Sequence, residues 1–99
     1  MYHVRYTESA LQDLEDIFSY IAMDNLDRAL SFALELKEHF DGVLSVFPNG
    51  GTLYNPDKGI RKHSYKGHTA FYHVPDAENV EVLHVINLRK PMTARGIEI

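Results

Sequence analysis

The stretch that decides the fold reads YTESALQDLEDIFSYIA, from Tyr6 to Ala22. Its apolar side chains recur at steps of three and four residues, which places them on one face of an α-helix. These side chains are Ala10, Leu11, Leu14, Ile17, Phe18 and Ile21. Thr7 or Ser9 can cap the first turn, and Ser9 followed by Gln12 has the spacing of a capping box. The stretch therefore predicts an amphipathic helix with one buried face.

The sequence predicts a short strand before this helix and a second helix after it. Residues 2–6 alternate between apolar and polar side chains, which is the period of a half-buried strand. From residue 26 to about residue 47, apolar residues again recur at helical spacing, and Asp24 or Asn25 can cap this second helix. A Pro-Asn-Gly-Gly run from Pro48 ends it. Because so few residues join the two helices, we expect an antiparallel hairpin.

The second half of the chain predicts three strands joined by short connections. The strands are expected at residues 60–66, 69–74 and 80–88, and residues 52–59 are expected to form a loop. Connections this short make neighbouring strands antiparallel. The expected fold class is therefore α+β, a two-layer β-α-α-β-β-β arrangement with the helical hairpin packed on one face of a small antiparallel sheet. We expect residues 1–99 to form this single domain.

Composition and charge narrow the class of protein. The chain is 44% hydrophobic and 24% charged, as in ordinary globular domains, and it has no cysteine for a disulfide or a thiolate site. No apolar run approaches the roughly 20 residues that cross a bilayer, so we expect a cytoplasmic protein without membrane contact. Residues 1–50 carry three basic and nine acidic side chains, a net charge of −6, whereas residues 51–99 carry seven and five, a net charge of +2. The helical half is therefore acidic and the strand half is weakly basic.

Four short motifs follow the predicted elements in a fixed order. They are Pro48-x-x-Gly51 after the helices, Gly59-Ile60-Arg61 at the start of a strand, Ala70-Phe71-Tyr72-His73-Val74 in the next strand, and the last strand from Val80 to Arg89. Together with the opening strand and helix, they resemble toxins of the ParE branch of the RelE/ParE superfamily of bacterial toxin–antitoxin modules. The resemblance covers roughly residues 2–91. It implies that the chain is the toxin of a type II module, inhibits DNA gyrase by binding, and is neutralised by a cognate antitoxin protein.

The chain departs from the ribonuclease branch of this superfamily at the end of the last strand. Relatives usually carry His-x-Arg there, whereas this chain has Asn87 and keeps Arg89. It also lacks the tyrosine that RNA-cutting relatives often have near the C-terminus. A ribosome-directed nuclease approaches a dense polyphosphate, which favours a basic protein, and this chain has a net charge of −4. These points favour a non-enzymatic toxin with no catalytic residue.

Two alternatives remain open beside gyrase inhibition. One is a ribosome-dependent mRNA endonuclease of the RelE type, with RNA or the ribosome as partner. Such an enzyme needs a base, an acid and positive charge at the phosphate, and Arg61, His63, His84 and Arg89 are the residues that could supply them. The other alternative is a non-toxic binding module derived from the same fold. No cofactor is expected, and no metal, because no histidine pair has the spacing of helical metal ligands.

The last predicted strand has one apolar face and one mixed face. Side chains alternate along a strand, so Val80, Val82, His84, Ile86 and Leu88 are expected to face the helices. The mixed face is expected to bind the antitoxin through Leu83, Val85, Asn87 and Arg89, unless loop 52–59 or the C-terminal tail covers it.

The target is expected to contact three cationic side chains on the strands. These are Arg61, Lys62 and Arg89. An arginine guanidinium offers a planar fork of donors that suits an acidic group or a phosphate. We therefore expect a target-binding surface at the strand ends.

Overall fold

Both helices of the computed structural model, which describes residues 1–87, begin directly after a capping residue. Helix α1 spans Glu8–Ala22, and the Thr7 hydroxyl accepts a hydrogen bond from a backbone N–H of the first turn at 3.1 Å. Helix α2 spans Leu26–Val46, and the Asn25 side-chain oxygen accepts one at 3.0 Å. Both predicted helices are confirmed. Neither is long and apolar enough to cross a membrane, within the residues described.

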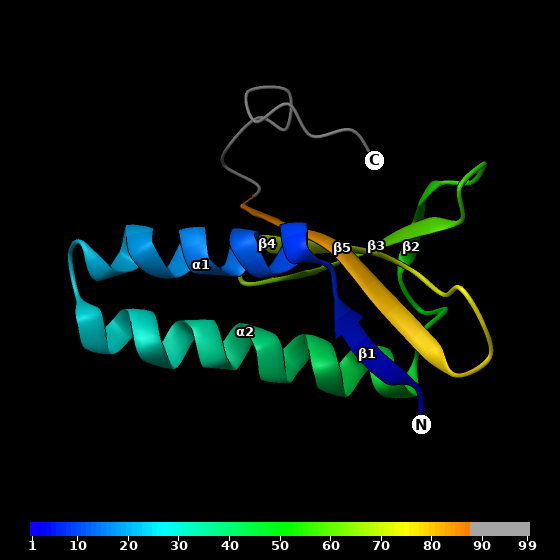
Figure 1. Cartoon of the computed structure of the whole chain (residues 1–99), viewed down its shortest axis with the longest axis horizontal. Helices are drawn as coiled ribbons and strands as arrows, with labels where there is room; N and C mark the ends of the chain where they lie inside the picture. The colour runs from blue at the N-terminus through cyan, green and yellow to red at the C-terminus, as the bar shows by residue number, and fades with distance from the viewer. Residues whose placement is uncertain (88–99) are drawn as a thin grey trace.

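Within residues 1–87 the sheet contains five strands, one more than expected. Figure 1 shows how they lie beside the two helices. They are β1 His3–Tyr6, β2 Thr52–Asn55, β3 Ile60–Tyr65, β4 His68–His73 and β5 Asn79–Asn87. Their order in the sheet is β1-β5-β4-β3-β2. The additional strand, β2, lies in the segment expected to be a loop and pairs with β3 along the outer edge of the sheet.

The sheet is mixed, whereas the sequence predicted an antiparallel one. β1 pairs parallel to β5, and the other neighbouring strands are antiparallel. A parallel pair of strands needs a long connection. Between β1 and β5 this connection consists of all the elements from α1 to β4. The α+β class and the two layers are confirmed, with β1 as the one parallel member.

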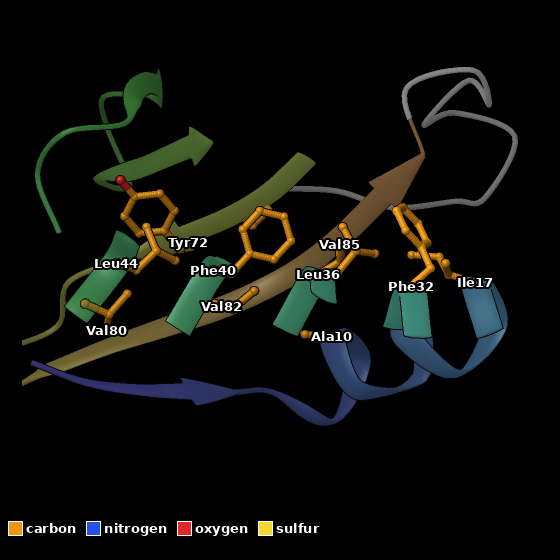
Figure 2. Close-up of a cluster of buried hydrophobic side chains, with 11 residues drawn as sticks. Ala10, Ile17, Phe32, Leu36, Phe40, Leu44, Tyr72, Val80, Val82 and Val85 are labelled. Carbon is orange, nitrogen blue, oxygen red and sulfur yellow. The ribbon is translucent and has the colours of Figure 1, made fainter. Parts of the chain in front are cut away.

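The main core lies between the helical hairpin and one face of the sheet (Figure 2). Helix α2 contributes four apolar side chains to it, Phe32, Leu36, Phe40 and Leu44, and β4 and β5 contribute the opposing ones. The fully buried members with the largest volumes are Tyr72, Phe40, Leu36, Leu44, Val80, Val82 and Val85. The helices therefore cover only one face of the sheet, as the sequence predicted.

A bulge in β5 changes which side chains of this strand face the helices. In the β4–β5 ladder, Tyr72 pairs with Val82 and Phe71 pairs with His84, which leaves Leu83 as an extra residue. One extra residue shifts the alternation of side chains by one position. The predicted assignment of side chains to the two faces of the sheet is therefore correct for Val80 and Val82, before the bulge, and wrong for the residues after it.

The residues after the bulge lie on the faces opposite to those expected. Val85 is fully buried in the main core, so its expected exposure to a partner is wrong. Ile86, expected to face the helices, packs with Ile60 and Phe71 in a second cluster, and Leu83 lies against that cluster.

Asn87 also lies on the helix side of the sheet. It pairs with His68, whose ring packs edge-on against Phe32 of α2 at 5.2 Å between centroids. Residues opposite each other in a ladder point to the same face. Leu88 and Arg89 lie outside the described residues.

Candidate functional site

An exposed apolar stripe runs along α2. Leu26, Leu30 and Leu34 follow one another at steps of four residues and therefore share one side of the helix. They are 57%, 56% and 58% exposed, so none of them belongs to the core. A row of exposed leucines on one helix is a candidate surface for a partner. We call these three residues the leucine stripe.

The leucine stripe faces the side of α2 on which β1 and α1 lie. Lys37 and Asp41 continue the same side of the helix, at steps of three and four from Leu34. The Tyr6 hydroxyl, at the end of β1, donates a hydrogen bond to Asp41 at 2.7 Å. Because β1 leads directly into α1, the stripe borders the outer surface between the two helices.

A hollow of about 490 Å³ lies at the tip of the hairpin. Residues from the end of α1, the connecting loop and the start of α2 line it. These residues are Tyr20, Ile21, Met23, Asp24, Asn25 and Arg28. Met23 is 87% exposed, which adds further apolar surface to this end of the hairpin.

Arg61, expected to bind the target or a phosphate, is held by the loop after α2. Its guanidinium donates to the Gly51 carbonyl oxygen at 2.9 Å. The Gly51 N–H donates to the buried Tyr72 hydroxyl at 3.0 Å. Burial raises the pKa of Tyr72, and the Gly51 hydrogen bond and the Arg61 charge oppose that shift. Arg61 therefore takes part in the packing of this loop against the sheet.

His63 lies on the helix face of β3. It is in register with Ala70, which is in register with Val85, and both partners are buried in the main core. The His63 Nε2 atom lies 2.9 Å from Nε2 of His39 on α2. His63 therefore contacts α2 and not the open face of the sheet.

His84 lies at the edge of β5 that α1 covers, beyond the part paired with β1. The Asp13 carboxylate of α1, 4% exposed, accepts a hydrogen bond from the Val85 N–H at 3.0 Å. The same carboxylate oxygen lies 2.9 Å from Nδ1 of His84. Asp13 thus binds a backbone group that a neighbouring strand would otherwise pair, and His84 is a rim histidine beside it.

His63 and His84, the two candidate acid–base residues within residues 1–87, do not lie together. β3 and β5 are separated by β4, and His63 contacts α2 whereas His84 contacts α1. Phe71, the ladder partner of His84, belongs to the cluster on the other face. Arg89 lies outside the described residues.

The two described target-binding candidates also point to different faces. Adjacent residues of a strand alternate, and Arg61 contacts the loop after α2 on the helix side. Lys62 is exposed, and its ammonium group lies over the Tyr54 ring at 5.8 Å from the centroid. They therefore form no common cationic patch.

The strand face expected to bind the antitoxin is partly covered. Tyr54 of β2 packs edge-on against Phe71 at 4.9 Å between centroids. The segment 52–59, considered above as a possible cover, therefore does contribute to covering this face. Of the expected contacts, Leu83 alone lies there within the described residues.

Comparison with known proteins places the fold among toxin–antitoxin systems. A chain of the chromosomal ParDE toxin–antitoxin system from P. aeruginosa shares it with a TM-score of 0.74 and 19% identity, over 89% of this chain and 97% of that one. A chain of the RelBE2 toxin–antitoxin complex from Mycobacterium tuberculosis matches with a TM-score of 0.57 and 25% identity, over 87% and 96%. No curated protein matches the sequence.

The family follows from the sequence itself. The family model for the ParE toxin of the type II toxin–antitoxin system parDE matches residues 4–90. This chain belongs to the ParE toxin family, and the predicted resemblance is confirmed. Membership implies an antitoxin partner.

Proposed function

We propose that this protein is a toxin that binds and inhibits DNA gyrase without a chemical step of its own. Membership in the ParE family supports this function. The separation of His63 from His84 supports a binding mechanism. A general base and a general acid must both reach one phosphate and its neighbouring hydroxyl within hydrogen-bond distance. Two histidines on β3 and β5, one held at α2 and the other at α1, do not meet that requirement.

The proposed antitoxin site is the leucine stripe of α2. Partner helices and extended segments commonly place apolar anchors in such a row. The net charge of −6 in residues 1–50 favours a segment with basic residues beside its anchors. Leu83 is kept as a proposed second contact, whereas the burial of Val85 removes it from the proposed site.

The exposed ammonium group of Lys62 is the proposed contact for gyrase within the described residues. It belongs to the weakly basic half of the chain, and it lies beside an exposed aromatic ring. Gyrase works in the cytoplasm, so the same proposal places this protein there.

Two assays with the purified protein test this function. In the first, relaxed plasmid and gyrase are incubated with increasing toxin, and we expect supercoiling to stop or cleaved plasmid to accumulate. In the second, a reconstituted translation system receives the same concentrations, and we expect the message to stay intact. Message cleavage with unaffected gyrase would establish the endonuclease alternative, and no effect in either assay would establish the binding module.

A further inference from the structure

Two histidines join α2 to β3 on the side of α2 opposite the leucine stripe. His39 lies nine positions after Leu30, about two and a half helical turns, which places it on the other side of the helix. The Nε2 atoms of His39 and His63 are 2.9 Å apart, the ring planes differ by 14°, and the ring centroids are 5.2 Å apart. The centroid distance is close to the N···N distance plus one ring radius on each side. The rings therefore lie edge to edge with their Nε2 atoms facing each other.

This geometry requires that one Nε2 atom donates and the other accepts. A neutral imidazole carries a hydrogen on one nitrogen only, so His39 and His63 must be opposite tautomers. One added proton keeps the contact as a charge-assisted hydrogen bond between a cation and a neutral ring. Two added protons leave no acceptor between the nitrogens and place two cations in contact.

Aromatic rings hold the pair in place. The Tyr65 ring stacks on His39 with 3.7 Å between centroids and 11° between planes. Phe40 packs edge-on against His39 at 5.8 Å and against His63 at 6.1 Å. These contacts fix both ring orientations, so protonation must act on the hydrogen bond itself.

The charged groups beside the pair compensate each other. Glu35, one turn before His39, accepts a hydrogen bond from the Tyr65 hydroxyl at 2.6 Å and forms an ion pair with Lys66. Burial lowers the pKa of His39, and the Glu35 charge opposes that shift. Burial also lowers the pKa of His63, and the charge of His39 adds to that shift.

We propose that His39 and His63 form a proton-controlled joint between α2 and β3. The hydrogen bond between the two Nε2 atoms persists while at most one of the two imidazoles is protonated. It breaks when both imidazoles are protonated. The joint connects the helix that carries the leucine stripe to the strand that carries Lys62. The inference concerns the isolated protein and does not depend on the proposed gyrase target.

The sign of the pH dependence follows from the two lowered pKa values. Histidines of the unfolded chain have a pKa near the ordinary value of roughly 6.5, so they bind protons at a higher pH than the folded pair does. The contribution of the pair to stability is therefore complete above roughly pH 6.5 and is lost as the pH falls through the folded-state values. Glu35 and Lys66 stay charged throughout, because their ion pair lowers the pKa of Glu35 and raises that of Lys66.

Urea unfolding of the full chain between pH 8 and pH 5 tests the joint. Each proton that binds the unfolded chain but not the folded chain favours unfolding as the pH falls. It should raise the equilibrium constant for unfolding by up to about tenfold for each pH unit below pH 6.5. We expect His63→Gln to flatten this slope, because the pair then no longer takes up two protons. His3→Gln, which removes an exposed histidine of β1, is the matched control. Equal slopes for His63→Gln and the wild type would overturn the proposal.

A second measurement does not depend on a variant. Nitrogen NMR of the wild-type histidines at pH 7.5 should show one Nε2 of the pair protonated and the other not, as opposite tautomers. On acidification the two rings should titrate in two coupled steps. Identical tautomers with independent titrations would overturn the proposal even if His63→Gln failed to fold.

Discussion

At Gly51 the backbone passes so close to Tyr72 that no side chain fits between them. A Cβ atom there would collide with the Tyr72 hydroxyl and lie 2.7 Å from the Lys62 carbonyl oxygen. The same glycine donates to that hydroxyl and accepts from Arg61. The Pro-x-x-Gly motif therefore has a physical basis, which is the close approach of the loop to the sheet.

Gly51→Ala is expected to lower the free energy of unfolding by roughly 1–3 kcal/mol, the usual cost of overpacking a tight site. Gly42→Ala is the control, because its Cβ would meet nothing within 4 Å and it lies inside α2. Alanine should stabilise the helix there by roughly 0.5–1 kcal/mol. Urea unfolding at pH 7.5 measures both. Changes of the same sign would contradict this account of the motif.

Asp13 is a second residue that contacts the backbone directly, through the Val85 N–H, and it also contacts the His84 ring. Replacing it with alanine leaves the buried Val85 N–H without its acceptor, at a cost of roughly 1–3 kcal/mol. Asp13→Asn keeps an oxygen for that N–H and should cost less. Glu15→Ala, at an exposed position of α1, should change stability by no more than about 0.5 kcal/mol. Equal losses for the alanine and asparagine variants at Asp13 would show that the Val85 contact is unimportant.

At the scale of elements, the helices were predictable because their signals are local. Apolar spacing and a capping residue define each of them within about 20 residues of sequence. The second half of β5 was not predictable in this way. Its bulge at Leu83 depends on the register with β4 and on Asp13 from α1, and neither appears in the alternation of the strand. The parallel pairing of β1 is likewise set by a distant strand.

The leucine stripe was missed for a different reason. Leu26 and Leu30 share helical spacing with core residues such as Leu36 and Phe40. Spacing alone shows that these residues lie on a helix, whereas the sheet decides which side of the helix is buried. A helical-wheel comparison would have separated two apolar sides of α2, but it would not have identified the exposed one.

If the stripe binds the antitoxin, Leu30→Gln and Leu34→Gln should weaken the complex tenfold or more, as loss of a central apolar anchor does. Val46→Gln is the matched control, because Val46 is also apolar, 53% exposed and on α2, but lies on the opposite side. Isothermal titration with the cognate antitoxin measures all three. Equal weakening by the Val46 change would remove the stripe as the proposed site.

On the scale of the whole molecule, the two layers differ in charge and in their contacts. The acidic helical layer bears the leucine stripe, and the weakly basic strand half bears Lys62. The proposed antitoxin and target sites therefore lie on different layers. The sequence predicted the charge difference between the two halves of the chain, but it placed both the antitoxin site and the target site on the strands.

A binding mechanism predicts that no single histidine is essential. His63→Gln and His84→Gln should each keep gyrase inhibition within a few fold at pH 7.5. Lys62→Ala should weaken it in part, because one contact among several is lost. A nuclease would lose about 10²–10⁴ in rate with its general acid or base. Complete loss of activity in a folded histidine variant, with message cleavage lost in parallel, would contradict the binding mechanism.

The parallel pairing of β1 with β5 has a consequence for biosynthesis. Thr7, just after β1, donates a hydrogen bond to the Leu83 carbonyl oxygen across 76 positions of sequence. Before β5 leaves the ribosome, the nascent chain lacks the strand that lies between β1 and β4 in the sheet. Contacts this distant in sequence also form slowly. The complete sheet therefore forms only after β5 has been synthesised, and a chain terminated before β5 does not reach the toxin fold.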